Sequence, residues 1–263
     1  MAGIYVHIPF CRQACHYCDF HFSTSKHGVA PLLKAIGHEL KLQRHYLEGQ
    51  QIRTLYFGGG TPSIVPAGEI ARIIDQVRTQ FPMAPDAEIT LEANPDDIQA
   101  SLVREWMGAG INRLSIGIQS FADSDLQWLN RAHHAGQAEG SVKTSQDTGI
   151  ENITIDLIYG IPVSADGQWQ RNVQQAIELQ VPHISAYCLT IEEKTVFGHR
   201  YRKGELSPLP DTTSASQFLY LVNTLETSGI HLYEVSNFSK PGFESKHNSA
   251  YWTGDHYLGI GPS

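Results

Sequence analysis

Six short runs rich in β-branched and aromatic residues recur along the chain, and they constrain its fold more than any other feature. They lie at 3–8, 52–57, 88–93, 113–118, 153–159 and 183–189. Runs of this length and composition predict β-strands. Most segments between them carry apolar residues at helical spacing, as in Ile70, Ile73, Ile74 and Val77. This order predicts an α/β protein with parallel strands and helices outside, either a flat doubly wound sheet or a partial barrel.

Two further expectations concern the interior and the longest loop. The strand runs are taken as nearly continuous apolar stretches, as expected for strands that helices cover on one side. The segment 193–210 is expected to be irregular, with Pro208 and Pro210 stopping regular structure before the next helix. A chain of 263 residues with 41% hydrophobic residues is large enough for one substantial core.

Charge and cysteine usage exclude several classes of function. The net charge of −8, with 19 scattered Lys and Arg residues, opposes general nucleic-acid binding. No apolar run approaches the roughly 18 to 20 residues that span a bilayer, so no membrane span is expected. The N-terminus has no basic region before an apolar stretch, which predicts a cytoplasmic protein. Three of the four cysteines are bunched, which indicates metal chemistry in a reducing compartment rather than a disulfide framework.

The bunched cysteines Cys11, Cys15 and Cys18 follow the first predicted strand directly. A structural zinc site or an ordinary iron–sulfur cluster takes four protein ligands, so a fourth is missing. His16 or His21 would complete a zinc site, although structural zinc typically staples small domains that lack a core. A [4Fe–4S] cluster held by three thiolates, with one iron left open for another ligand, fits the spacing better.

Polar residues cluster at the predicted carboxyl ends of the strands, the edge where parallel α/β folds hold their active sites. Singly, each has a structural explanation, such as a glycine turn or a capping carboxylate. Together, around a three-cysteine loop, they predict a site. They are Gly59, Gly60, Thr61, Glu92, Asn94, Gln119, Asp156, Tyr187 and Cys188.

The CxxxCxxC spacing after a first strand resembles that of the radical S-adenosylmethionine (SAM) enzymes. The resemblance implies a (βα)₆ partial TIM barrel and a [4Fe–4S] cluster with Cys11, Cys15 and Cys18 as its ligands. In that family the open iron binds the methionyl group of SAM. An electron from the cluster then cleaves SAM to methionine and a 5′-deoxyadenosyl radical.

The resemblance covers essentially the whole chain and is narrower than the superfamily. YVHIPFC, YFGGGTPS, LEANP, GIQSF, LNRAH and IDLIYGIP look like the coproporphyrinogen dehydrogenase branch, which includes oxygen-independent coproporphyrinogen III oxidases and haem chaperones. By itself, Arg131 is a cation that complements a helix end, and Cys188 is a small buried strand residue. The resemblance implies instead that SAM is contacted or approached by Tyr5, Tyr17, Gly59, Gly60, Thr61, Glu92, Gln119, Arg131, Asp156 and Cys188.

Two details separate the members of this branch. The decarboxylating oxidases resemble CxxxCxxCxC, whereas Phe20 stands at the place of the last cysteine here, and they carry sequence ahead of the first strand. HNSAYW at 247–252 resembles a motif of the haem chaperones, which implies haem contacts from His247, Asn248, Tyr251 and Trp252. From its six letters alone, this segment would be a polar turn before a strand.

The resemblance therefore predicts a radical SAM core at 1–230 and the start of a C-terminal region at 231–263. Because the relatives carry a further domain, the chain is expected to be an N-terminal portion. The expected function is a cytoplasmic haem chaperone that binds a [4Fe–4S] cluster, SAM and haem and transfers haem to acceptor proteins. An electron donor would serve the cluster. The alternatives are an oxygen-independent coproporphyrinogen III dehydrogenase and a zinc-stapled binding module without redox chemistry.

Overall fold

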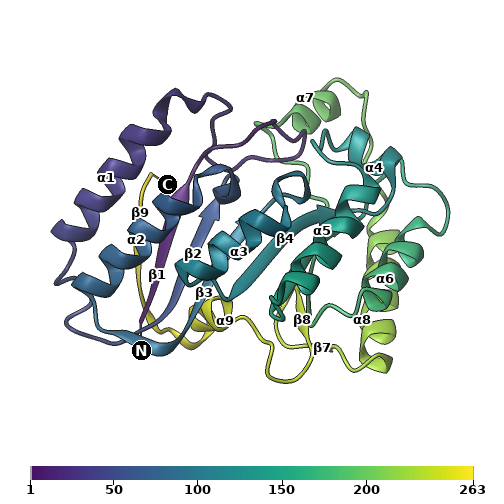
Figure 1. Cartoon of the computed structure of the whole chain (residues 1–263). Coiled ribbons are helices and arrows are strands. Elements are labelled where there is room, and N and C mark those ends of the chain that lie inside the picture. Colours follow the sequence, from purple (N-terminus) through teal and green to yellow (C-terminus); the bar gives the residue numbers. More distant parts are fainter. Residues whose placement is uncertain (1, 263) are drawn as a thin grey trace.

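A nine-stranded sheet organises residues 2–262, the part of the chain that the computed structural model describes (Figure 1). Its strand order is β7-β8-β6-β5-β4-β3-β2-β1-β9. The strands are β1 Ala2–Ile8, β2 Ile52–Gly59, β3 Met83–Ala93, β4 Arg113–Gln119, β5 Ile153–Tyr159, β6 His183–Cys188, β7 His231–Leu232, β8 Asn237–Ser239 and β9 His256–Ile260.

The six predicted strands correspond to β1–β6, and each pairs in parallel with the next along the chain. The prediction of parallel strands with helices outside is thus confirmed. Three further strands extend the sheet. Strand β8 pairs antiparallel with β6, and β9 pairs parallel with β1 at the opposite edge. The division of the chain at residue 230 stays a prediction.

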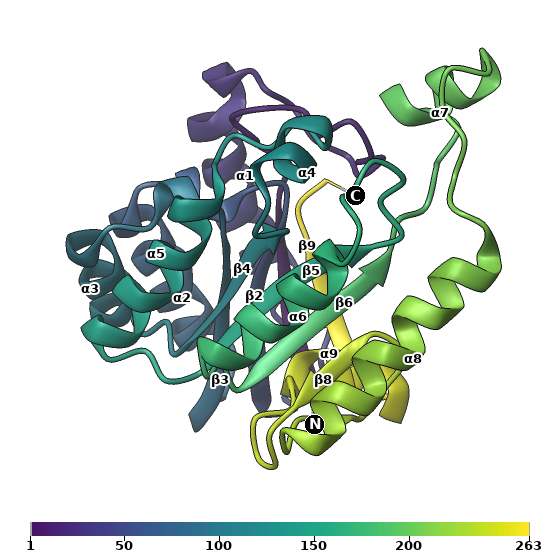
Figure 2. The same cartoon turned by 90° about the vertical axis from the view of Figure 1, so that its right-hand side faces the viewer.

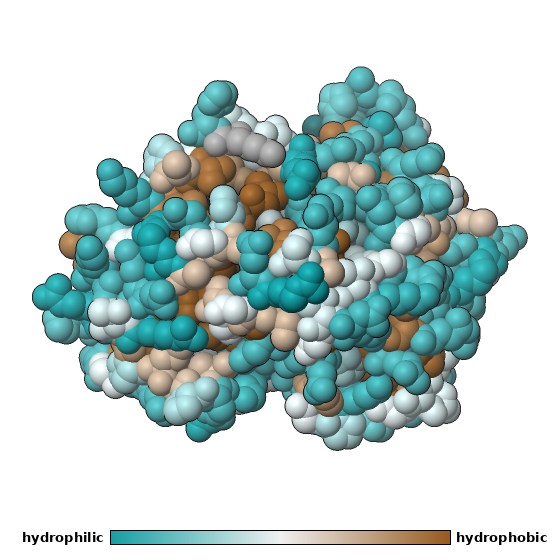
Figure 3. Space-filling model, viewed as in Figure 1, coloured by the Kyte–Doolittle hydropathy of each residue, from teal (hydrophilic) through white to brown (hydrophobic). Residues whose placement is uncertain are grey.

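Helices cover the outer face of the curved sheet (Figure 2). Their apolar stripes turn inward: Ile70, Ile73, Ile74 and Val77 of α2 are fully buried. Hydrophilic residues dominate the face seen in Figure 3, and hydrophobic residues show as smaller patches among them. The helices are α1 Val29–Leu42, α2 Ala67–Gln80, α3 Ala100–Ala109, α4 Asp123–Trp128, α5 Ala135–Thr148, α6 Gln168–Glu178, α7 Val196–Arg202, α8 Asp211–Thr227 and α9 Lys246–Thr253.

The strands are not continuous apolar stretches, and that expectation is wrong. Successive side chains of a strand point to opposite faces. In β5, Ile153, Ile155 and Leu157 face the helices, whereas Thr154 and Asp156 between them face the concave side. The same alternation recurs in neighbouring strands because the concave side encloses a polar cavity rather than an apolar core.

The segment 193–210 is also more regular than expected, because it contains helix α7. The Thr195 hydroxyl caps this helix by accepting a hydrogen bond from the Gly198 N–H at 3.0 Å. Phe197 is fully buried and packs against Trp128, with ring centroids 4.0 Å apart. The proline prediction holds further on, since α8 begins directly after Pro210.

The two motifs of the sequence lie at opposite ends of the strands (Figure 1). The cysteine loop follows the carboxyl end of β1. Helix α9, which contains HNSAYW, packs at the starts of β1 and β2, where His247 contacts Gly3 and Thr54. The segment is therefore a helix and not a polar turn. No helix within residues 2–262 is long and apolar enough to cross a membrane.

Candidate functional site

The cysteine loop leaves β1 and folds back over the carboxyl edge of the sheet. Backbone hydrogen bonds close its base, with Cys11 N–H donating to Ser23 O at 3.0 Å. Cys11, Cys15 and Cys18 are free thiols and partly exposed. Burial raises the pKa of Cys11, and it raises the pKa of Cys18 to about 11, with the neighbouring thiols adding to both shifts. The three sulfurs are therefore close enough to influence one another.

The GGGTP turn after β2 is attached directly to this loop. Gly60 N–H donates to Ile8 O at 2.9 Å, and Thr61 N–H donates to Phe10 O at 2.7 Å. A Cβ atom on Gly60 would lie 2.8 Å from both the N and the O of Phe10, and 3.0 Å from Cys11 Sγ. Only a residue without a side chain allows this approach. The glycines thus serve a tight turn and bring bare backbone beside a thiol.

Arg131 connects the cysteine loop to the strand ends. Its Nη1 donates to Cys15 Sγ at 3.3 Å, and its Nη2 donates to Gly117 O at 2.7 Å and to Asn94 Oδ1 at 2.9 Å. Its Nε is buried and has no hydrogen-bond partner among the described residues. The guanidinium is thus directed into the site and not simply at the end of α4. Tyr17 lies beside it, and burial raises the pKa of its phenol.

The fit of these residues to an iron–sulfur cluster rests on their chemistry. Thiolate sulfur is the ligand that such clusters take, and a nearby cation favours the thiolate form. Three free thiols supply the sulfur, and the Arg131 guanidinium donates a hydrogen bond to Cys15 Sγ beside them. Among residues 2–262, the structure places no group of three or more His, Cys, Asp or Glu side chains close enough together to hold a metal ion.

Two carboxylates, one from β3 and one from β5 on either side of β4, face the concave side below the loop. Glu92 Oε1 accepts the Tyr56 hydroxyl at 2.9 Å, and Oε2 accepts Gly59 N–H at 3.2 Å. The Asp156 oxygens accept the Ser115 hydroxyl at 3.4 and 3.5 Å. Burial raises the pKa of Glu92 to about 7 and that of Asp156 to about 6. Both groups thus titrate near neutral pH.

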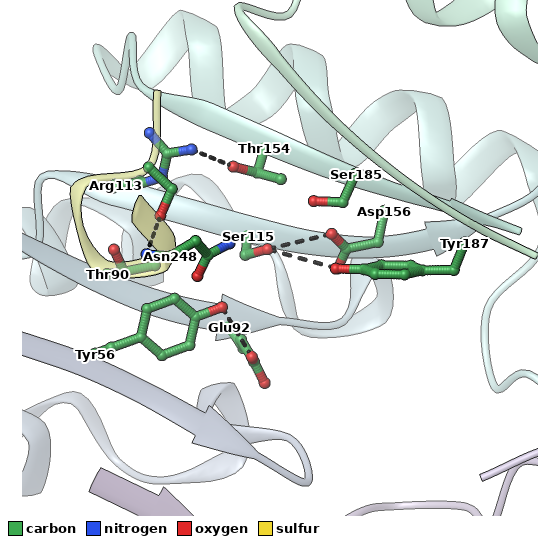
Figure 4. A pocket seen from close by; sticks show the side chains of 11 residues that line it. Tyr56, Thr90, Glu92, Arg113, Ser115, Thr154, Asp156, Ser185, Tyr187 and Asn248 are labelled. Atoms are coloured by element: carbon green, nitrogen blue, oxygen red, sulfur yellow. Dashed lines mark hydrogen bonds between the residues drawn. The ribbon is translucent and has the colours of Figure 1, made fainter. Parts of the chain in front are cut away.

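These carboxylates line a small cavity of about 60 Å³ inside the curved sheet (Figure 4). Every lining side chain is polar or charged, so the cavity suits a ligand with several hydrogen-bonding groups. The lining residues are Tyr56, Thr90, Glu92, Arg113, Ser115, Thr154, Asp156, Ser185, Tyr187, Ser245 and Asn248.

The remaining predicted SAM residues lie near this region in different settings. Tyr5 packs parallel to Tyr56 with ring centroids 5.9 Å apart. Gln119 is buried at the end of β4 with a φ of 70°. Cys188 is exposed, so its reading as a small buried strand residue is wrong. The last two residues of β6, Tyr187 and Cys188, are both exposed, whereas the four before them are buried.

The four predicted haem residues divide between the interior and the surface. His247 is 3% exposed, with Nδ1 hydrogen-bonded to Thr54 Oγ1 at 2.8 Å and Nε2 to Tyr251 Oη at 3.1 Å. Asn248 lines the cavity. Tyr251 and Trp252 are 50% and 65% exposed. The motif therefore presents aromatic surface outside and a buried imidazole directly behind it.

Sequence reasoning missed several residues of the cavity, among them Tyr56, Ser115 and Ser185. They are not at strand ends but within β2, β4 and β6. A signal was available, because each lies two positions from another polar residue of its strand, as Ser115 does from Arg113. This spacing places both on one face of the sheet.

Comparison with known proteins gave consistent matches. A model of the radical SAM superfamily matches residues 5–176. The protein named heme chaperone HemW of Mycobacterium tuberculosis (strain H37Rv) is 38% identical over 264 residues, covering 99% of this chain and 68% of the relative. Heme chaperone HemW of Escherichia coli K12 is 37% identical over 263 residues, covering 98% and 68%. The chain thus spans about two thirds of the length of these relatives.

Among solved structures, one titled as the coproporphyrinogen III oxidase HemN of Escherichia coli, a radical SAM enzyme, superposes with a TM-score of 0.85. The match has 23% identity and covers the whole of this chain and 63% of that one. At this identity the likeness concerns the fold, and it confirms the partial barrel expected from the sequence.

Proposed function

Because the chain belongs to the radical SAM superfamily and, within it, to the family of proteins named heme chaperone HemW, we propose that it functions as a haem chaperone. It would hold a [4Fe–4S] cluster, SAM and haem, and it would transfer haem to acceptor proteins. A cytoplasmic setting and an electron donor for the cluster are parts of the same proposal. The observation that carries it is the junction of Arg131 with Cys15 and two strand ends.

Cys11, Cys15 and Cys18 would hold the cluster, and the cluster when bound would supply an open iron for SAM and a source of one electron. The protein's own residues orient the rest of the ligand. Backbone groups of Gly59 to Thr61 suit the methionyl ammonium, and Arg131 suits its carboxylate through the buried Nε that has no partner among the described residues.

Glu92 and Asp156 suit the hydroxyl groups of the ribose or the ammonium. Their position in a polar cavity below the cysteine loop supports this role. Tyr5, Gln119 and Cys188 complete the proposed surroundings of SAM. Tyr17 would contribute by covering the loop beside Cys15, since both interact with Arg131.

The haem part of the proposal rests on α9. Tyr251 and Trp252 offer exposed aromatic faces for a porphyrin, and His247 offers an imidazole for the iron. Asn248 follows His247 in the first turn of the same helix. Because Tyr251 holds His247 Nε2, iron ligation requires its phenol to release that nitrogen. Because Tyr251 lies four residues after His247 on the same helix, haem binding would rearrange the side chains of α9 itself.

The first experiment tests the cluster and SAM. Anaerobic reconstitution should give about four irons per chain and an electron paramagnetic resonance signal that changes when SAM is added. A colourless protein that binds one zinc ion under the same conditions would support the zinc alternative instead.

The second experiment tests haem. The Soret band of added haem should report weaker binding for His247→Ala than for the wild type. His256→Ala is the matched control because His256 is exposed in the neighbouring strand β9. Equal affinities in the wild type and His247→Ala would remove His247 as a ligand. Incubation of the reduced protein with SAM and coproporphyrinogen III tests the dehydrogenase alternative, which formation of protoporphyrinogen IX would establish.

A further inference from the structure

An aromatic contact links the HNSAYW segment of α9 to strand β2. The His247 ring stacks on Tyr56 with centroids 4.9 Å apart and an interplanar angle of 27°. Tyr5 flanks both rings, 5.9 Å from Tyr56 and 6.3 Å from His247. His247 is thus enclosed by β1 and β2 side chains as well as by its own helix. Any movement that exposes it must alter its contact with Tyr56.

The hydroxyl end of the Tyr56 side chain reaches Glu92, a residue proposed to bind SAM. Its hydroxyl donates to Glu92 Oε1 at 2.9 Å, as the dashed line in Figure 4 marks. The second oxygen of the same carboxylate accepts the Gly59 N–H at 3.2 Å. Two donors from β2 therefore fix both oxygens of Glu92, and one of them belongs to the glycine turn beside the cysteine loop.

We propose that Tyr56 is a positioning residue that couples the two ends of the barrel. Its phenol orients the Glu92 carboxylate for SAM, and its ring holds His247 in the buried position. This inference rests on the proposed function, because SAM is taken as the ligand at Glu92. Coupling between binding sites is reciprocal, so SAM should stabilise buried His247, and release of His247 should weaken SAM binding.

A purely structural role for Tyr56 is the competing explanation. A packing residue would need its ring alone, and phenylalanine would replace it without loss. Tyr56 instead lines the polar cavity, and its hydroxyl contacts a carboxylate. Burial and the Glu92 charge also raise the pKa of this phenol, which keeps it protonated and able to donate. Phenylalanine and leucine variants therefore separate the two functions of the side chain.

The experiment measures SAM affinity of the cluster-reconstituted chain and, in the cluster-free chain, the rate of His247 modification by diethyl pyrocarbonate. Tyr56→Phe should weaken SAM binding about tenfold, as expected for loss of a hydrogen bond to a charged group. It should leave His247 protected because the ring remains. Tyr56→Leu should weaken SAM binding and also accelerate His247 modification. Tyr220→Phe in α8, remote from both sites, is the control for exchanging a tyrosine.

A double-mutant cycle with Glu92→Gln identifies the route of the effect. In the Glu92→Gln background, Tyr56→Phe should weaken SAM binding less than twofold further. Full addition of the two losses would overturn the positioning role, and so would wild-type affinity in Tyr56→Phe. Unchanged His247 modification in Tyr56→Leu would overturn the coupling to α9. If the wild type itself fails to bind SAM, the proposed function fails and takes this inference with it.

Discussion

Replacement of Glu88 should loosen α9 and destabilise the whole barrel. Glu88 is 4% exposed, and it accepts the first two amides of α9, Lys246 N–H at 3.2 Å and His247 N–H at 3.1 Å. A carboxylate at this position also complements the helix dipole. Its Oε2 lies 3.8 Å from Nη1 of Arg113, which is 1% exposed. Glu88→Gln removes the charge while keeping the shape of the side chain.

The magnitude follows from these contacts. Breaking a buried ion pair by removing one partner costs about 3–5 kcal/mol, because the remaining charge is left uncompensated. Arg113 keeps hydrogen bonds to Asn152 Oδ1, Thr154 Oγ1 and Phe243 O, so the lower end applies. In addition, glutamine has one acceptor oxygen in place of two. One of the two α9 backbone N–H groups would therefore face the glutamine NH₂ group instead of an acceptor. We therefore expect Glu88→Gln to lower the free energy of unfolding by about 3 kcal/mol.

Urea unfolding followed by circular dichroism measures this loss, and hydrogen exchange of the α9 amides locates it. The matched control is Asp86→Asn, an exposed carboxylate two residues earlier in β3, which should change stability by less than about 0.5 kcal/mol. The reasoning would be refuted if Glu88→Gln lost no more stability than this control. Unchanged protection of the α9 amides would refute the assignment of the loss to that helix.

Three further predictions concern the site and its pH dependence. Gly60→Ala should lower the iron content after reconstitution, because its Cβ would collide with Phe10 backbone, whereas Gly68→Ala, with open space around it, should not. SAM affinity should rise between about pH 6 and pH 8 as Glu92 ionises around its pKa of about 7, and Glu92→Gln should flatten that profile. Burial lowers the pKa of His247 to about 4. Between the ordinary histidine pKa of about 6.5 and that value, the unfolded chain binds a proton that the folded chain does not, so stability falls as pH falls. His247→Gln should reduce the loss in urea midpoint between pH 7 and pH 5, and an identical loss in both proteins would contradict this assignment.

The strands of the barrel were predictable because their signal is local. Five of the six runs became strands within two residues of their expected bounds, because β-branched composition and flanking turns act over short stretches. Strand β3 begins five residues earlier than expected, at Met83. The inward polar face was also encoded locally, in pairs such as Arg113 and Ser115, although the apolar content of the runs concealed it. Helix α7 was missed because Pro208 and Pro210, which follow it, dominated the interpretation of that segment.

Contacts between distant residues decided everything else about the candidate sites. The sequence by itself determined the order of strands and helices and which residues carry reactive groups. It could not place Arg131 on Cys15, which is 116 positions away, nor His247 on Thr54, which is 193 positions away. It also could not show that Cys188 is exposed. Such contacts depend on how the whole sheet curves and how helices close its ends. Only the tertiary structure therefore placed the cysteine loop and the HNSAYW helix at opposite ends of one barrel, with Tyr56 between them.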